Sequence, residues 1–179
     1  MPSSWPVRAG LALAMLIAAS VRWAEAEFSH KDAQILGRTL GYVGDGNTGT
    51  AIVGIAFAPA DPASRREAEA IRAIIGDGLP TGRVRLQARL VPVDQLAGAT
   101  DLNALYVTAG LAGSMGAVSG AAQRLHVPTV STDPACVQSG GCVVGFSSEP
   151  TVQIVIDRSA AERTGVRFLQ AFRMLVREK

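Results

Sequence analysis

Five residues in three loop-like segments carry the groups best placed to bind a ligand. Ser64, Gly110, Ser114, Thr132 and Asp133 all lie shortly after apolar runs that predict buried strands. In open α/β sheets, ligands bind beyond the carboxyl ends of the strands. Two of the segments also lead into predicted helices, whose free N–H groups attract anions. We therefore predict a ligand-lining edge, with ordinary capping and turn chemistry as the alternative for Ser64 and Asp133.

Sequence patterns for catalysis or metal binding are weak in comparison. The segment 110–113 has neither the G-x-G-x-x-G nor the G-K-[ST] spacing of a phosphate-binding loop, and the nucleophile pattern G-x-S-x-G does not occur. His30 and His126 are the candidates for a metal, and His30 also for haem. An exposed first helical turn for His30, and a loop or core position for His126, are the alternatives. We predict a non-enzymatic protein without a metal or another cofactor.

The first 26 residues have the three parts of a secretory signal peptide. Arg8 is followed by an apolar run over residues 9–21, and Ala24-Glu25-Ala26 resembles a cleavage site. The apolar run is shorter than the roughly 20 residues that span a bilayer. We expect cleavage after Ala26, which leaves residues 27–179 as one periplasmic domain. An uncleaved N-terminal anchor is the alternative.

Cys136 and Cys142 are the two cysteines of the chain. An even number of cysteines in an exported protein predicts a disulfide. Two free thiols or a metal pair are the alternatives. The C-x5-C spacing is not a zinc pattern, and no histidine lies between the two cysteines.

The charge of the predicted mature domain is nearly balanced. Arg8, Arg22 and Glu25 belong to the signal peptide, so 15 basic and 14 acidic residues remain of the 17 and 15 in the whole chain. A nucleic-acid-binding domain needs a concentrated basic surface. We therefore expect no nucleic-acid partner.

Strands and helices alternate along the chain, which predicts an α/β fold with a mostly parallel central sheet. Apolar or alternating runs predict strands at 50–58, 83–90, 104–109 and 127–130. Three sequences of the capping-box type predict helix starts at Ser29, Ser64 and Ser159. A further helix is predicted over residues 115–125. The expected architecture is a single three-layer domain.

The end of the chain predicts a β-hairpin and a terminal helix. Strands at 142–146 and 151–156 flank a short segment with a proline. Residues after Ser159 predict a single helix with one apolar face, formed by Ala161, Gly165, Phe168, Phe172 and Leu175. The cations at its end, Arg173, Arg177 and Lys179, suit the helix dipole.

The C-terminal part of the sequence resembles the last third of YfiR-like periplasmic proteins. The shared features are a Val-Thr/Ser-Asp strand end, a Gly-Gly pair, a hairpin, an Ala-Ala pair and a final amphipathic helix. The matching residues are Val130, Ser131, Asp133, Gly140, Gly141, 152–156, Ala160, Ala161 and 168–175. The opening helix and residues 51–57 fit the first units of the family more loosely. The aromatic-rich opening helix with a Trp-Pro, usual in the family, is missing here.

This resemblance implies a periplasmic α/β regulator that binds another protein. The best-known members hold down a membrane diguanylate cyclase by contacting its periplasmic domain, often as dimers, and disulfides affect their fold. We therefore expect a periplasmic or membrane protein as partner, and both a monomer and a homodimer stay open as the oligomeric state. The fold also resembles half of a transporter substrate-binding protein. A small-molecule, haem or metal binder that uses the strand-end loops or His30 is accordingly the alternative function.

Overall fold

The computed structural model describes residues 27–179. The predicted signal peptide, residues 1–26, lies outside the described residues, so its cleavage stays a prediction. Within residues 27–179, no helix is both long and apolar enough to cross a membrane.

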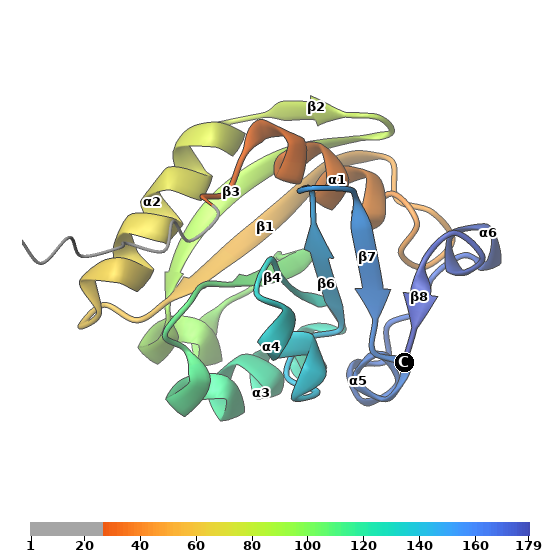
Figure 1. Ribbon diagram of the computed structural model, residues 1–179. Coiled ribbons are helices and arrows are strands. Elements are labelled where there is room, and N and C mark those ends of the chain that lie inside the picture. The colour runs from red at the N-terminus through yellow and green to blue at the C-terminus, as the bar shows by residue number, and fades with distance from the viewer. Residues whose placement is uncertain (1–26) are drawn as a thin grey trace, which may run out of the picture.

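An eight-stranded mixed sheet forms the centre of the domain (Figure 1), with strand order β2-β3-β1-β4-β5-β6-β7-β8. Neighbours from β3 to β6 are parallel, β2 and β7 pair antiparallel with β3 and β6, and β8 is parallel to β7. The predicted α/β fold, mostly parallel sheet and hairpin are confirmed. The strands are β1 (Gly49–Phe57), β2 (Leu79–Thr81), β3 (Val84–Pro92), β4 (Ala104–Val107), β5 (Thr129–Ser131), β6 (Val144–Ser147), β7 (Gln153–Ile156) and β8 (Arg177–Glu178).

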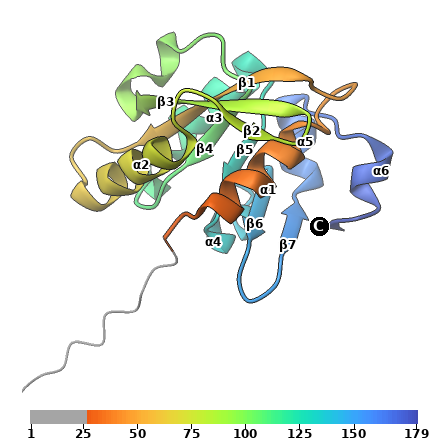
Figure 2. The same cartoon turned by 90° about the horizontal axis from the view of Figure 1, so that it is seen from above.

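Helices cover both faces of the sheet, which gives the predicted three layers. α1 and α2 lie on one side and α3 on the other, as the view from above shows (Figure 2). The helices are α1 (His30–Leu40), α2 (Pro62–Ile75), η1 (Val93–Gly98), η2 (Ala112–Ser114), α3 (Met115–Leu125), α4 (Pro134–Gln138), α5 (Arg158–Thr164) and α6 (Gln170–Arg173).

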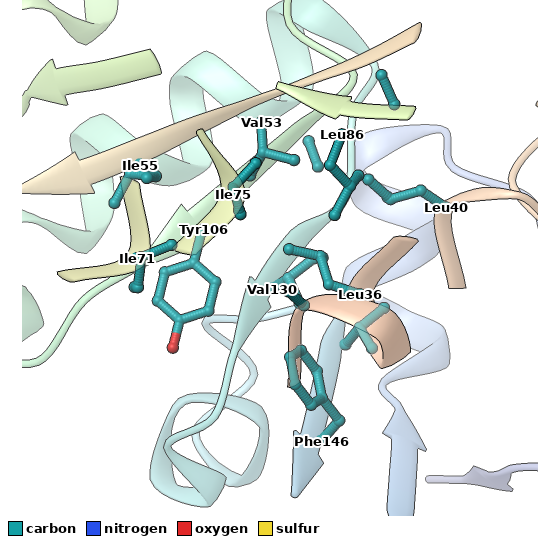
Figure 3. Close-up of a cluster of buried hydrophobic side chains, with 14 of the residues drawn as sticks. Leu36, Leu40, Val53, Ile55, Ile71, Ile75, Leu86, Tyr106, Val130 and Phe146 are labelled. Carbon is teal, nitrogen blue, oxygen red and sulfur yellow. The ribbon is translucent and has the colours of Figure 1, made fainter. Parts of the chain in front are cut away.

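Two hydrophobic clusters join these layers. In the first, Ile71 of α2 lies beside Ile55 of β1, and Leu36 of α1 lies near Val130 of β5 and Phe146 of β6 (Figure 3). In the second, Val118 of α3 belongs to the cluster on the opposite face of the sheet. Burying one such side chain completely contributes about 1.5–3 kcal/mol, so this double burial fixes the strands between two helical layers.

Aspartates begin two helices where serines were predicted. Ser29 and Asp32 form the predicted capping box of α1. The side chain of Asp61, however, caps α2 and accepts the N–H groups of Ala63 and Ser64 at 2.8 and 3.4 Å. The predicted Ser64 cap is wrong because Pro62, which has no N–H to donate, already occupies the first turn. Asp157, not Ser159, likewise caps α5.

The predicted continuous helix after Ser159 is also wrong in its length. α5 ends at Thr164, because Gly165 adopts a left-handed conformation with φ 69° that terminates the helix. The chain then forms the four-residue α6 and the edge strand β8. Leu175, predicted to be buried, is 78% exposed.

The segment after α5 returns to the loop that follows α1. The Gly44 N–H donates to the Arg167 carbonyl at 2.8 Å, and Val43 forms a β-bridge with Phe168. The rings of Tyr42 and Phe172 stack with centroids 4.9 Å apart. These contacts hold the end of the described chain against its beginning.

We predict opposite effects of glycine-to-alanine substitution in two helices. A Cβ on Gly37 in α1 would lie 1.8 Å from the Thr81 hydroxyl oxygen of β2, so Gly37→Ala should destabilise the domain by about 1–3 kcal/mol. Gly120 in α3 is exposed and a Cβ there meets nothing within 4 Å. Gly120→Ala should therefore stabilise by about 0.5–1 kcal/mol. Urea unfolding followed by circular dichroism measures both, and equal effects would contradict the close contact between α1 and β2.

Candidate functional site

The loops after β1 and β4 meet beyond the carboxyl ends of these strands. Gly110, with φ 80°, lies so close to Asp61 that a Cβ would approach the Asp61 Oδ2 atom to 2.3 Å. The only side chain that fits at this position is therefore hydrogen. The structure thus brings the Ser64 and Gly110 segments together, as the sequence predicted for a common edge of the sheet.

The Ser64 hydroxyl is buried within this edge and bonded on both sides. It accepts the Ala58 N–H at 3.0 Å and lies 2.7 Å from the Thr108 hydroxyl. Thr108 donates to the Ala56 carbonyl at 2.9 Å, so Ser64 is the donor between the two hydroxyls. Ser64 is 0% exposed, and its bonds link α2 to β1 and β4.

Thr132 takes part in a second group of polar contacts around Tyr106. The Tyr106 hydroxyl lies 2.7 Å from the Thr132 hydroxyl and 3.4 Å from the Glu67 carboxylate. Glu67 also accepts the Ala109 N–H at 2.8 Å. Burial, and secondly the charge of Glu67, raises the pKa of Tyr106 above its ordinary value. The phenol therefore stays protonated and remains a hydrogen-bond donor here.

The Phe28 ring closes this group from one side. It meets the Tyr106 ring edge-on, with centroids 5.4 Å apart, and is 5% exposed. The first residues of the described chain thus cover the phenol. The hydroxyl groups at the strand ends thus form hydrogen bonds to one another and to neighbouring backbone groups, and together they make a packed polar layer.

The remaining predicted ligand-binding residues lie at helix starts. Asp133 caps α4, where its side chain accepts the Ala135 N–H at 2.8 Å. This is the ordinary capping chemistry given as its alternative. Ser114 precedes α3 and makes no side-chain hydrogen bond to that helix.

The predicted disulfide is present and joins α4 to the loop that follows it. Cys136 and Cys142 are bonded, with Cα atoms 5.2 Å apart, and Cys142 is fully buried. Next to this loop, Thr129 accepts the Val143 N–H at 2.9 Å. The disulfide therefore fixes a loop that packs on the last parallel strands of the sheet.

Neither histidine lies in an evident metal site. His30 is exposed at the first turn of α1. His126 ends α3 in a left-handed conformation, with Nδ1 3.3 Å from the Thr164 carbonyl oxygen. Among residues 27–179, no group of three or more His, Cys, Asp and Glu side chains is arranged to hold a metal ion.

A hollow of about 240 Å³ lies at the other side of the domain, between α5 and the end of the described chain. The sequence did not predict it, since it depends on the break of the last helix at Gly165. Its lining combines arginines, two glutamates and apolar side chains: Ile156, Arg158, Ala161, Glu162, Val166, Arg167, Phe168, Arg173 and Glu178.

Glu178 is the acidic centre of an ion-pair group at this hollow. Both Arg158 and Arg173 donate to its carboxylate, the latter through Nη2 at 3.0 Å. The hydrogen bond from Arg173, followed by that from Arg158, lowers the pKa of Glu178 to about 2. Arg173 therefore pairs with a carboxylate on β8, which differs from the predicted role at the end of a long helix.

The loop between α1 and β1 contains a glycine pattern that the sequence-based prediction did not include. Residues 44–49 have the G-x-G-x-x-G spacing, but they lead from α1 into β1. A dinucleotide-binding loop needs the reverse order, from a strand into a helix. The spacing therefore does not form a phosphate site of that type here.

Comparison with known proteins supports the fold. No protein-family model and no curated protein matches the chain. A conserved domain protein from Vibrio cholerae O1 biovar El Tor has a similar structure, with TM-score 0.56 and 13% identity, over 83% of this chain and 59% of that one. An ABC domain from Streptococcus pneumoniae, in complex with L-tryptophan, gives TM-score 0.49 and 13% identity over 72% and 54%. This chain thus spans less than two thirds of either protein, and the first likeness shows the α/β fold alone.

We predict that Thr108 is a structural residue of the strand-end layer. Thr108→Val removes the donor to the Ala56 carbonyl and the acceptor for Ser64, both in buried surroundings. The free energy of unfolding should fall by about 1–3 kcal/mol in urea titrations. Thr151→Val, at an exposed position before β7, is the matched control and should change it by less than about 0.5 kcal/mol. An unchanged stability of the Thr108 variant would contradict this role.

We predict that Glu178 stabilises the domain in a pH-dependent manner. Its pKa is lower in the folded state than the ordinary value of 4.5. The stabilisation is therefore complete above about pH 4.5 and is lost as the pH falls towards about 2. Glu178→Gln should lower the Tm at pH 7, and the difference from the wild type should vanish near pH 2. A difference that stays constant across this range would show that the ion pairs do not contribute.

Proposed function

We propose that this protein is an exported, non-enzymatic regulator that acts by binding another protein, as its resemblance to YfiR-like proteins implies. The observation that carries the proposal is the exposure of two neighbouring large apolar side chains. Met174 is 76% and Leu175 78% exposed. Contiguous exposed apolar surface marks interaction sites, because a partner can remove it from water. Each square ångström of apolar surface buried in this way contributes about 25 cal/mol.

Export to the periplasm is part of the proposal. It is supported by the signal-peptide pattern of residues 1–26 and by the disulfide between Cys136 and Cys142. Disulfides persist in oxidising compartments such as the bacterial periplasm and are rare in the cytosol.

The alternative, a small-molecule binder that uses the strand-end loops, receives less support. Ser64, Thr108 and Tyr106 contact protein groups at hydrogen-bond distance, and Phe28 packs on the phenol. A ligand at this edge would have to displace these contacts before it could bind.

Photo-crosslinking in living cells tests the proposal. A photoreactive amino acid is placed at one of three exposed positions on separate elements: Arg66 in α2, Val152 before β7, or Leu175 after α6. We expect a discrete protein adduct at position 175 at least. The absence of a protein adduct at all three positions would contradict action through protein contact.

Native mass spectrometry of the protein purified from the periplasm provides the second readout. We expect a chain that starts at Glu27, carries the disulfide and retains no small molecule, as a monomer or homodimer. A retained molecule that leaves on denaturation would favour the ligand-binding alternative. A chain that keeps residues 1–26 would favour an N-terminal anchor.

A further inference from the structure

Positive charge is concentrated in the last part of the chain. Residues 158–179 contain six of the 15 basic residues of the mature chain but only two of its 14 acidic residues. Residues 27–157 hold the other nine basic and twelve acidic residues, so the two parts have opposite net charge. The end of a nearly neutral domain thus carries a net positive charge, on α5, α6 and β8 at one edge of the sheet (Figure 1).

Part of this charge is not neutralised within the domain. Glu178 pairs with Arg158 and Arg173, and Lys179 pairs with Asp157 at 3.2 Å. Arg167 and Arg177, by contrast, are exposed and make no side-chain hydrogen bond or ion pair within residues 27–179.

The unpaired Arg167 borders the hollow of about 240 Å³, next to Phe168 and Arg173. Sites for drug-sized ligands have volumes of about 300–1,000 Å³. The hollow is smaller, and it suits a side chain inserted by a partner better than a whole small molecule. Met174 and Leu175 follow Arg173 directly in the turn between α6 and β8.

We propose that the surface formed by Arg167, Phe168, Arg173, Met174, Leu175 and Arg177 (the 167–177 surface) docks an acidic segment of a partner protein that also carries apolar side chains. The acidic groups pair with the unneutralised arginines, and the apolar groups cover Met174 and Leu175. This inference rests on the proposed function and adds the chemistry of the partner.

An anionic membrane surface is the competing occupant of a basic and apolar surface. Membrane-surface helices present a long apolar face opposite a basic face. α6 has only four residues, and just one of them, Phe172, is buried against the fold. The hollow, and an exposed apolar surface of only two adjacent side chains, therefore favour a protein segment.

Three synthetic peptides of equal length test the chemistry of the partner. The first alternates Asp or Glu with Leu or Phe, the second has Ser at the apolar positions, and the third has Lys at the acidic positions. Fluorescence anisotropy with the full mature protein should show that the first binds at least about tenfold more tightly than the others. Its affinity should fall as salt is raised, because exposed charges are screened. Equal affinities, or no binding of the first peptide, would overturn the proposal.

Two double variants locate the binding surface. R167E/L175S reverses one charge and removes one apolar group of the 167–177 surface, and it should weaken binding of the acidic–apolar peptide at least about tenfold. R66E/V152S makes the same types of change at exposed positions on α2 and before β7, and binding should be unchanged. An equal loss in both variants would show that only net charge matters and would overturn the assignment.

Vesicles of phosphatidylglycerol and phosphatidylcholine test the membrane. Sedimentation of the protein with these vesicles, together with no peptide binding, would overturn the proposal in favour of lipid. Failure of this inference is distinct from failure of the proposed function. A protein adduct at position 66 or 152 without peptide binding would overturn the 167–177 surface and leave protein contact in place. No adduct at any position would contradict protein contact itself.

Discussion

β1 is buried on both faces and paired on both edges, and the rest of the domain depends on this constraint. Val53 and Ile55 face the cluster formed with α1 and α2, while Ala56 belongs to the opposite cluster. The parallel neighbours β3 and β4 satisfy its backbone along both sides. A parallel strand of this kind requires a helical layer on each face. The crossover helix α2 and the layer of α3 follow from that requirement, and the carboxyl ends of the strands then meet at one edge.

The sequence predicts the elements that are long enough to show a continuous apolar run or a regular period. β1, β4, α1 and α3 are of this type. β2 and β8, with three and two residues, are too short for any periodic pattern, and they form only because β3 and β7 offer free edges. Gly165 was placed within a helix because its neighbours continue the helical period. Its left-handed conformation is a property of the backbone that the hydrophobic pattern does not contain.

The position of the candidate site could be predicted from the sequence. Whether its polar groups are free to bind a ligand could not. The strand ends place Ser64 and Gly110 at one edge, as the topology of open sheets implies. Whether the Ser64 hydroxyl faces a ligand depends on the neighbour that the sheet register brings to it. That neighbour is Thr108, which directly follows β4 and lies 44 residues away in sequence. Spacing within the chain contains no information on this pairing, and so the closed polar layer emerges only in three dimensions.

The same tertiary pairing determines how the 167–177 surface is presented. The stack of Tyr42 on Phe172 and the bridge between Val43 and Phe168 attach this segment to the loop between α1 and β1. Glu178 joins α5, α6 and β8 through its two arginines. These contacts order the backbone before any partner arrives, so less conformational entropy is lost on binding. The backbone that carries Arg167 and Arg173 is thus attached to the core. The exposed Met174 and Leu175 lie on the turn between α6 and β8, whose backbone is hydrogen-bonded.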